Sequence, residues 1–359
     1  MIPLENGTIK SKATNRIYYL DVLRVIACLA VVMIHSSSQY VSRDFGSLNF
    51  WVANICDGLS RIGVPLFVMI SGAVMLDENY GYTAKKLINH IKKMIVFFVF
   101  WSGIYCIIFQ VIDKIINHKA IRISDIMGSF VRGHFHLWYV YLIIGLYLIV
   151  PLLRLWVKRE NKKYVEYFII LSIIFTFLVP QIISLCSNFT NILEPLSVIM
   201  EKKLYLEYVG GYTAYFLLGW YLHSFDVKNK NVIYILGIIS LIVTVFGTYA
   251  LSVAKGKSLP LYDYLYLNIL LQAVMTFLFI KSMLINTKGD NKFVNIISKN
   301  SLGIYAVHIA IITALQKVTE MIGIDSAIIK IPFVFLLTFV ISTLVTYILG
   351  KIPILKRIV

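Results

Sequence analysis

The chain has 359 residues, of which 59% are hydrophobic and 14% are charged, and its mean hydropathy is +0.80. A soluble domain carries more charge and interrupts its apolar segments at strand or short-helix length, so this composition excludes an ordinary soluble protein. The net charge of +16 comes from Lys and Arg residues spread over many loops, which argues against a nucleic-acid-binding domain.

Ten apolar segments are long enough to cross a bilayer, for which about 18 or more residues are needed. They predict an all-α integral membrane protein with about ten transmembrane helices. The second and sixth segments are the least distinct, and the sixth contains Glu207 and three glycines. The expected spans are residues 19–38, 60–77, 94–112, 137–156, 164–186, 204–223, 231–253, 261–285, 299–317 and 330–350.

The loop charges predict the orientation, because Lys and Arg residues stay on the cytoplasmic side. With the N-terminus inside, the inner segments hold 21 of the 34 Lys and Arg residues and the outer segments hold 12. Both termini are therefore expected in the cytoplasm, as a segment of residues 1–18 and a tail of residues 351–359 flanking one membrane domain, residues 19–350. Asp21 and Arg24 interrupt the first apolar segment, which favours a retained helix over a cleaved signal peptide.

The sequence gives little support for a metal or a permanently bound cofactor. It contains no Walker-type or dinucleotide-binding glycine loop. His134 and His136 alone have a ligand-like spacing, and the carboxylates that usually accompany such ligands are few, so no metal is expected. The four cysteines lack paired spacing and are expected to be small buried apolar side chains. They are Cys28, Cys56, Cys106 and Cys186.

Three ionisable residues lie in the first span: Asp21, Arg24 and His35. On a helix, Arg24 and His35 are almost three turns apart, so both project from one face about 16 Å apart along the axis. Asp21 is close enough to Arg24 for an ion pair. His35 follows the apolar run VIACLAVVMI, where an ionisable group is costly and a functional role is the default expectation. Interfacial Asp21 and Arg24 side chains, and a structural histidine bonded to a neighbouring helix, stay open as alternatives.

The pattern of Arg24, ten residues and His35, within LDVLRVIACLAVVMIH, resembles membrane acyltransferase family 3, the integral-membrane O-acyltransferases. Three further segments extend this resemblance over most of the chain. They are RIGVPLFVMISG in the second span, HLWYVYLIIGLYLIVPLLR in the fourth and SLGIYAVH in the ninth. The second and fourth spans look most like the branch that acts on sugars of bacterial surface glycans.

This resemblance implies transfer of an acyl group, usually acetyl from cytoplasmic acetyl-CoA, to a hydroxyl of a surface or lipid-linked glycan outside a bacterial cell membrane. It implies that His35 is catalytic and that Arg24 helps to hold the donor. The family often has arginines at the start of the third span, where this chain has Lys92 and Lys93. Lysine meets a CoA phosphate as a point charge but not as a bidentate fork, and these two lysines are expected to complete the donor site.

Transfer from a thioester to a hydroxyl needs a base and a means of stabilising the oxyanion. Histidine is the usual base near neutral pH, so His35 is expected to act as general base, with a covalent acyl-histidine as the alternative. The basic residues lie toward the inner face and His35 toward the outer face. CoA is therefore expected to dock inside, with its pantetheine arm reaching up between the helices, and a lipid-facing His35 would exclude this arrangement.

Further candidates for substrate binding lie on other spans. Ser301, Tyr305 and His308 are spaced by four and three residues, so Tyr305 and His308 are expected either to contact substrate or to bond neighbouring helices. Arg61 is expected to open the second span on the outer side and bind the acceptor. The alternative is a plain i,i+4 pair with Asp57.

His136, with Trp138 and Tyr139, is expected to form a sugar-binding surface, or the two aromatic residues anchor a span end. A transporter or flippase for a lipid-linked glycan, and a non-catalytic scaffold among surface-polymer biosynthesis proteins, remain alternatives, because intramembrane charges are also typical of carriers. A carrier should show twofold repetition with matched helix breaks. The VPLF and SG motifs near residues 64–72 have no counterpart in the second half of the chain.

Overall fold

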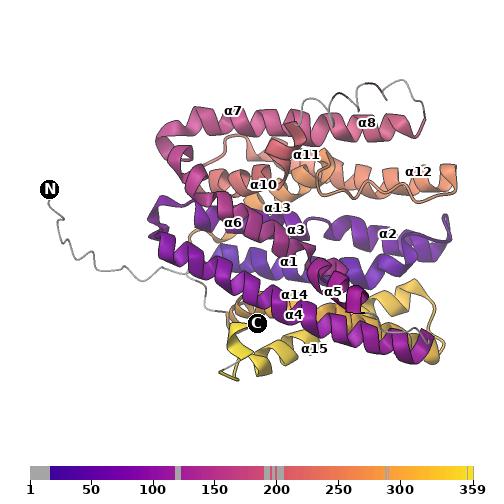
Figure 1. Ribbon diagram of the computed structural model, residues 1–359. Helices are drawn as coiled ribbons and strands as arrows, with labels where there is room; N and C mark the ends of the chain where they lie inside the picture. The colour runs from indigo at the N-terminus through magenta and orange to yellow at the C-terminus, as the bar shows by residue number, and fades with distance from the viewer. Residues whose placement is uncertain are drawn as a thin grey trace.

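The computed structural model describes residues 17–117, 123–189, 206–287 and 291–353, together with residues 195, 199, 289 and 355–358. Of the predicted cytoplasmic segment of residues 1–18, only the last two residues lie within these ranges. The α-helices, labelled in Figure 1, are α1 (Tyr18–Ser37), α2 (Leu48–Ser60), α3 (Gly63–Met75), α4 (Ala84–Asn117), α5 (Ile123–Arg132), α6 (Trp138–Trp156), α7 (Lys162–Ser172), α8 (Val179–Ser187), α10 (Leu206–Ser224), α11 (Lys230–Ile242), α12 (Thr248–Lys255), α13 (Leu267–Leu284), α14 (Lys292–Met321) and α15 (Ala327–Leu349). Short 3₁₀ or π segments are η1 (Ser38–Tyr40), η2 (Glu78–Tyr80), η3 (Phe135–Leu137), η4 (Arg159–Asn161), η5 (Ile173–Leu178), η7 (Val243–Gly247) and η8 (Leu355–Arg357).

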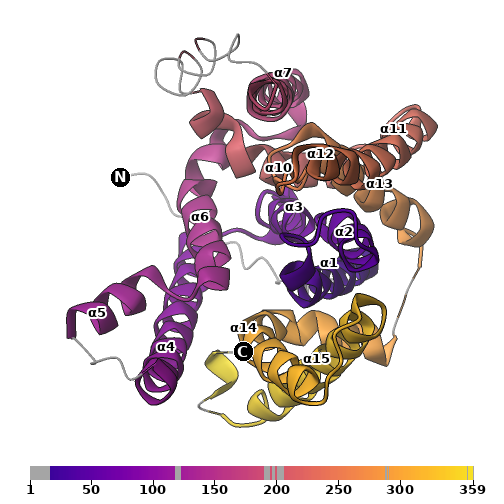
Figure 2. The same ribbon diagram turned by 90° about the vertical axis from the view of Figure 1, so that its right-hand side faces the viewer.

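The first helices of the chain form the centre of the bundle. Seen along the helices in Figure 2, α1, α2 and α3 are surrounded by α4–α6 on one side, α10–α13 on another and α14–α15 on a third. α1 contacts α2, α3, α13, α14 and α15. The three ionisable residues of α1 that the sequence singled out, Asp21, Arg24 and His35, therefore lie on the central helix of the fold.

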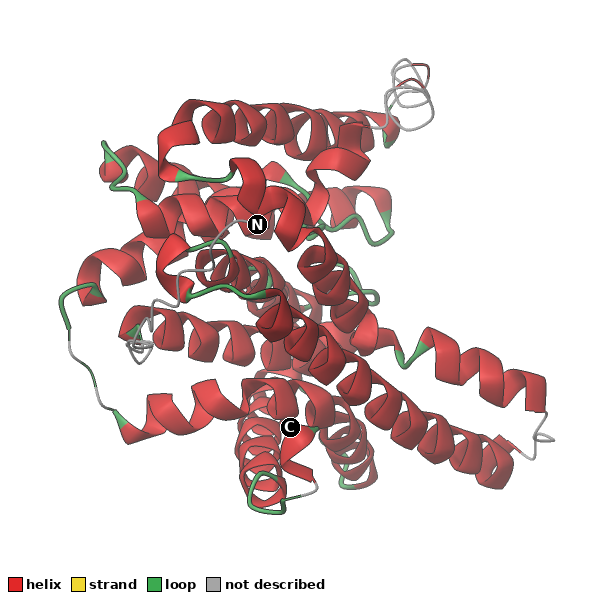
Figure 3. Ribbon diagram, turned by 60° about the vertical axis from the view of Figure 1, so that its left-hand side comes forward, coloured by secondary structure: helices red, strands yellow, loops and turns green. Residues whose placement is uncertain are grey.

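The predicted all-α membrane class is confirmed. All regular structure in the described ranges is helical (Figure 3). Nine helical stretches within these ranges are long and apolar enough to cross a membrane. The expected sixth span overlaps α10, which is not among the nine and is interrupted at Gly211. Of the four cysteines, which are all free thiols, Cys28 and Cys106 are buried as predicted, whereas Cys56 and Cys186 are half-buried.

The predicted start of the second span, residue 60, is wrong. One apolar stretch runs from Leu48 to Met75 through α2 and α3. Its helix begins where Ser47 Oγ accepts a hydrogen bond from the Phe50 amide at 3.1 Å, which satisfies one of the unpaired donors of the first turn. The second span thus includes the whole of α2.

The ion pair between Asp57 and Arg61 explains this extension. Arg61 binds both carboxylate oxygens of Asp57, with the Nη2–Oδ2 contact at 2.8 Å, and the Asp57 side chain is fully buried. Because each charge compensates the other, both are tolerated inside the span. The prediction that Arg61 opens the second span at its outer edge is therefore wrong, since Arg61 lies at the α2–α3 junction within the span.

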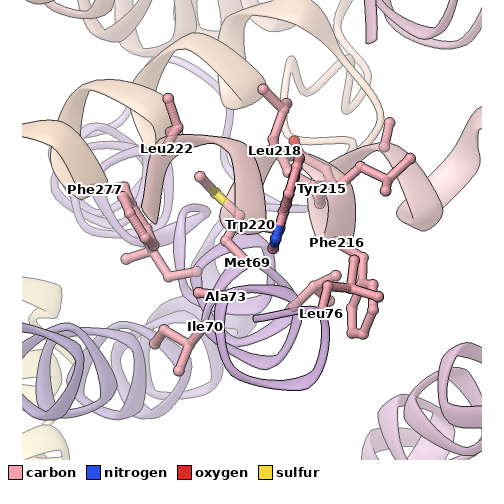
Figure 4. Packing of buried hydrophobic residues seen from close by; sticks show 14 of the residues in the cluster. Met69, Ile70, Ala73, Leu76, Tyr215, Phe216, Leu218, Trp220, Leu222 and Phe277 are labelled. Atoms are coloured by element: carbon pink, nitrogen blue, oxygen red, sulfur yellow. The ribbon is translucent and has the colours of Figure 1, made fainter. Parts of the chain in front are cut away.

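Two glycines let α3 and α10 approach closely. A Cβ at Gly72 of α3 would collide with the backbone of Phe216, and a Cβ at Gly219 of α10 would collide with the backbone of Met69. Small residues allow membrane helices to pack backbone to backbone in this way. Figure 4 shows the large side chains that flank this contact, with Phe277 of α13 beside them.

Candidate functional site

His35 lies in the last turn of α1 and faces the protein rather than lipid. Its ring lies 5.2 Å from the ring of His308 in α14 and 5.6 Å from that of Phe135 in η3, measured between centroids. The α1 helix ends here as serine hydroxyls turn back onto its carbonyls, for example Ser36 onto Val32 at 2.8 Å. The lipid-facing position that would exclude a catalytic His35 is thus not found.

Four histidines from three parts of the chain form one cluster: His35, His134, His136 and His308. The His134 and His136 rings are joined Nδ1 to Nδ1 at 2.8 Å, and the His136 ring lies 5.5 Å from that of His308. His134 is stacked on Tyr105, with 4.7 Å between centroids. Within the described ranges, no three His, Cys, Asp or Glu side chains are placed to share a metal ion.

The hydrogen bond of His308 fixes its tautomer. Its Nδ1 lies 2.7 Å from the carbonyl oxygen of Tyr305, which only accepts hydrogen bonds, so Nδ1 carries the hydrogen. A neutral ring then keeps its lone pair on Nε2. The Nε2 atoms of both His308 and His136 are buried without a hydrogen-bond partner among the described residues. Buried polar atoms are nearly always paired, so the histidine cluster is a place where a further polar group is expected to bind.

Tyr305 connects the cluster to a cavity beneath it. Its hydroxyl donates a hydrogen bond to the carbonyl oxygen of His136, and its side chain also lines a largely apolar cavity of about 140 Å³. We call this the apolar cavity. Val31, one turn before His35, lines it too. Its other lining residues are Val64, Phe67, Met94, Tyr139, Ile143, Tyr147, Ser301 and Leu302.

The predicted ion pair between Asp21 and Arg24 is present, with Arg24 Nη1 3.0 Å from Asp21 Oδ1. Asp21 is buried and also accepts a hydrogen bond from Ser298 Oγ of α14 at 2.5 Å. The Arg24 side chain is 32% exposed. Arg24 lies two turns before Val31 on the same face of α1, and Val31 lines the apolar cavity.

Lys92 and Lys93 are exposed on α4, which begins ten residues before the predicted third span. The next residue, Met94, lines the apolar cavity. The two lysines therefore lie on the turn of α4 that reaches this cavity, with their side chains exposed.

A polar cluster that the sequence did not predict lies near the start of α1 and the ends of α3 and α10. His223 is hydrogen-bonded through Nδ1 to the Tyr19 hydroxyl, and its Nε2 lies 3.6 Å from Asp77 Oδ2. Burial acts to raise the pKa of Asp77, but hydrogen bonds from His223 and Asn79 hold that pKa below its ordinary value. The three side chains are more than 50 residues apart in sequence, so no local pattern could have revealed them.

The predicted surface formed by His136, Trp138 and Tyr139 is wrong as a unit. His136 is buried in the histidine cluster, and Tyr139 lines the apolar cavity. Trp138 lines a different cavity, stacked on Tyr264 with 5.9 Å between centroids. The reason is local geometry: successive residues of a helix point about 100° apart.

That other cavity has a volume of about 620 Å³. Four tyrosines, Trp138 and Arg61 line it, and we call it the tyrosine-lined cavity. Trp138 of its lining directly follows η3, the segment that contains His136 of the histidine cluster. The remaining lining residues and the four tyrosines are Ser184, Leu185, Ser187, Asn188, Tyr212, Leu251, Leu259, Pro260, Leu261, Tyr262, Asp263, Tyr264 and Tyr266.

Comparison with known proteins identifies one family. The sequence profile of the acyltransferase domain matches residues 17–350, a range that includes every helix from α1 to α15 and all the candidate site residues. No curated protein and no solved structure matches the chain.

Proposed function

The chain belongs to the acyltransferase 3 family, and on that premise we propose that it moves an acetyl group from acetyl-CoA to a hydroxyl of a cell-surface or lipid-linked glycan. The family makes it a membrane-bound acyltransferase acting on hydroxyl groups. The acetyl donor, the glycan acceptor, the bacterial cell membrane as location and the role of each residue below belong to the proposal.

His35 is the general base. Its ring nitrogen takes the proton of the acceptor hydroxyl while the hydroxyl oxygen attacks the thioester carbon. The carbon–sulfur bond then breaks, and the CoA thiolate leaves and recovers the proton from the imidazolium. The observation that carries this assignment is the position of His35 between two cavities. It lines one of about 190 Å³ together with His134 and Gln316, and Val31, one turn below it, lines the apolar cavity.

The donor approaches from the inner side. Arg24, Lys92 and Lys93 bind the CoA phosphates. Support for this role comes from helical spacing, because Arg24 lies two turns before Val31 on the same face of α1 and the two lysines directly precede Met94, and both Val31 and Met94 line the apolar cavity. The pantetheine arm occupies that cavity, and its thioester reaches the level of His35. The rise of α1 between Arg24 and His35, about 16 Å, is the length that the arm must bridge.

The other histidines and Tyr305 hold the reacting groups. The Nε2 atom of His308 accepts a hydrogen bond from a substrate hydroxyl, and the Nε2 atom of His136 binds a second polar group of the substrate. Tyr305 holds the His308 ring through its carbonyl oxygen and the main chain at His136 through its hydroxyl. Arg61 binds on the acceptor side. These roles explain why buried polar atoms are left without protein partners at the one place where a hydroxyl must enter.

The test is acetyl transfer by the purified protein in nanodiscs, with the acetyl group of acetyl-CoA labelled and a panel of glycan acceptors. Acceptor-dependent transfer is expected for the wild-type protein and for Arg43→Ala, an exposed arginine at the outer side. His35→Ala should lose transfer, and Arg24→Ala should require more acetyl-CoA. Transfer or CoA release that is indifferent to His35 would overturn the assignment and favour a carrier.

A further inference from the structure

The tyrosine-lined cavity is built by five parts of the chain that are distant in sequence, three of which supply its aromatic residues. α10 breaks its helical geometry at Gly211, where φ is +35° and ψ is −138°, a conformation that only glycine adopts easily. Tyr212 follows this break and enters the cavity wall. The segment between α12 and α13 contributes Tyr262, Tyr264 and Tyr266, and the start of α6 contributes Trp138.

The walls are held in place before any ligand binds. The carbonyl oxygen of Tyr264 accepts a hydrogen bond from Tyr215 at 2.6 Å. The Tyr266 hydroxyl lies 2.7 Å from that of Ser184, and the Tyr262 hydroxyl bonds to Asn54. Preorganised walls reduce the entropy that binding costs, so this cavity has the character of a binding site rather than of a packing defect.

The charges of the lining are arranged against an anionic ligand. Arg61, whose guanidinium lies 4.8 Å from the centre of the Tyr262 ring, is paired through two nitrogens with the fully buried Asp57. Asp263 is the other charged residue among the described lining residues, and it is exposed. A phosphate group would therefore meet a carboxylate and an already neutralised guanidinium.

The remaining groups suit a sugar. Aromatic faces pack against the C–H groups of a sugar ring, while the tyrosine hydroxyls and the Asn188 and Ser187 side chains offer hydrogen bonds to its hydroxyls. The volume of about 620 Å³ falls within the range of small-molecule sites. The cavity is also connected to the histidine cluster along the chain, because Trp138 of its lining directly follows η3, which contains His136.

We infer that the tyrosine-lined cavity binds the acceptor and selects an uncharged sugar over a phosphate-bearing polymer unit. The inference rests on the proposed transfer to a glycan, and it adds the site and the charge class of the acceptor. Trp138 and Tyr264 supply the stacking surfaces, and Asp263 supplies the discrimination against anions.

The experiment measures acceptor binding without requiring catalysis. Neutral oligosaccharides and glycerol-phosphate oligomers are titrated onto the full-length protein in nanodiscs, and binding is followed by saturation-transfer NMR. A neutral oligosaccharide should bind wild-type protein, and should bind Trp138→Ala and Tyr264→Ala at least about tenfold more weakly. Tyr249→Ala is the matched control, because Tyr249 packs on Trp51 and lies outside the cavity lining.

Asp263→Asn keeps an acceptor for the Leu265 amide but removes the charge, so it tests selectivity in a variant expected to fold. This variant should bind glycerol-phosphate oligomers more tightly than wild-type protein does. Tighter binding of the phosphate oligomers than of every neutral sugar by wild-type protein, or neutral-sugar binding unchanged in Trp138→Ala and Tyr264→Ala, would overturn the inference. Cavity-dependent sugar binding without any acetyl transfer would instead overturn the proposed function and leave the binding site standing.

Discussion

The rings of His35 and His308 face each other where α1 meets α14, with their centroids 5.2 Å apart. The Nδ1–H group of His308 is held by the carbonyl of Tyr305, so its Nε2 is left as an acceptor beside the proposed base. The roles of the two histidines can therefore be tested by separate mutations. In His308, Nδ1 makes a hydrogen bond within the protein, whereas Nε2 has no hydrogen-bond partner among the described residues.

Replacement of His35 by Gln should reduce the acetyl-transfer rate by about 10²- to 10⁴-fold, the usual contribution of a general base. Binding of acetyl-CoA should change little, since His35 is placed above the donor site. Rates and donor affinity are measured on the same nanodisc preparation. A variant that keeps more than about a tenth of the wild-type rate would exclude His35 as the base.

At His308, replacement by Asn tests the two ring nitrogens separately. The Asn amide stands near Nδ1 and can still donate to the Tyr305 carbonyl, whereas it has no group in place of Nε2. His308→Asn should therefore retain thermal stability but raise the KM for the acceptor by about tenfold, the value of one hydrogen bond to a buried group. Equal acceptor KM values in His308→Asn and wild-type protein would show that Nε2 has no substrate contact.

Loss of the Arg24 charge should act on the donor alone. Arg24→Ala should raise the KM for acetyl-CoA by about 10- to 100-fold, as expected for a charged hydrogen bond, with the acceptor KM unchanged. The KM of Arg24→Lys for acetyl-CoA should lie between the values for Arg24→Ala and wild-type protein, since lysine keeps the positive charge but cannot bind a phosphate through two N–H groups at once. A shift in the acceptor KM instead would place Arg24 elsewhere in the reaction path.

The pair of Asp57 and Arg61 predicts an unequal double-mutant cycle. Arg61→Met alone leaves the fully buried Asp57 carboxylate without a partner and should destabilise the fold by about 3–5 kcal/mol. Adding Asp57→Asn should recover much of that loss. Unfolding midpoints in detergent report the comparison, and additive effects of the two changes would show that the pair is not coupled.

Asp77 gives a pH dependence at the inner end of the bundle. Because its folded pKa is lowered, its contribution to stability is fully present above the unfolded value of about 3.9 and is lost as the pH falls through the folded value. Asp77→Asn should therefore lower the unfolding temperature at pH 7, and the difference from wild-type protein should shrink toward pH 3. Glu160→Gln, which changes an exposed carboxylate, should show no such trend.

Local patterns in the sequence predicted the membrane class, the positions of most spans, the ion pair of Asp21 with Arg24 and the protein-facing side of α1. These features depend on the apolar length of each segment and on helical spacing, which fix neighbours three, four and eleven residues apart whatever the rest of the fold does. The start of the second span was predicted wrongly because hydropathy counts Asp57 and Arg61 as two separate charges and takes no account of their ion pair.

Tertiary packing alone decided the rest of the site. The histidine cluster, the tyrosine-lined cavity and the contact between His223 and Asp77 join residues far apart in sequence. Their approach depends on backbones fitting together, as at Gly72 and Gly219, where α3 and α10 meet without room for a methyl group. Such long-range fits are set by the shapes of whole helices, so the sequence determined which residues are able to react while the packing of the helices determined which of them meet.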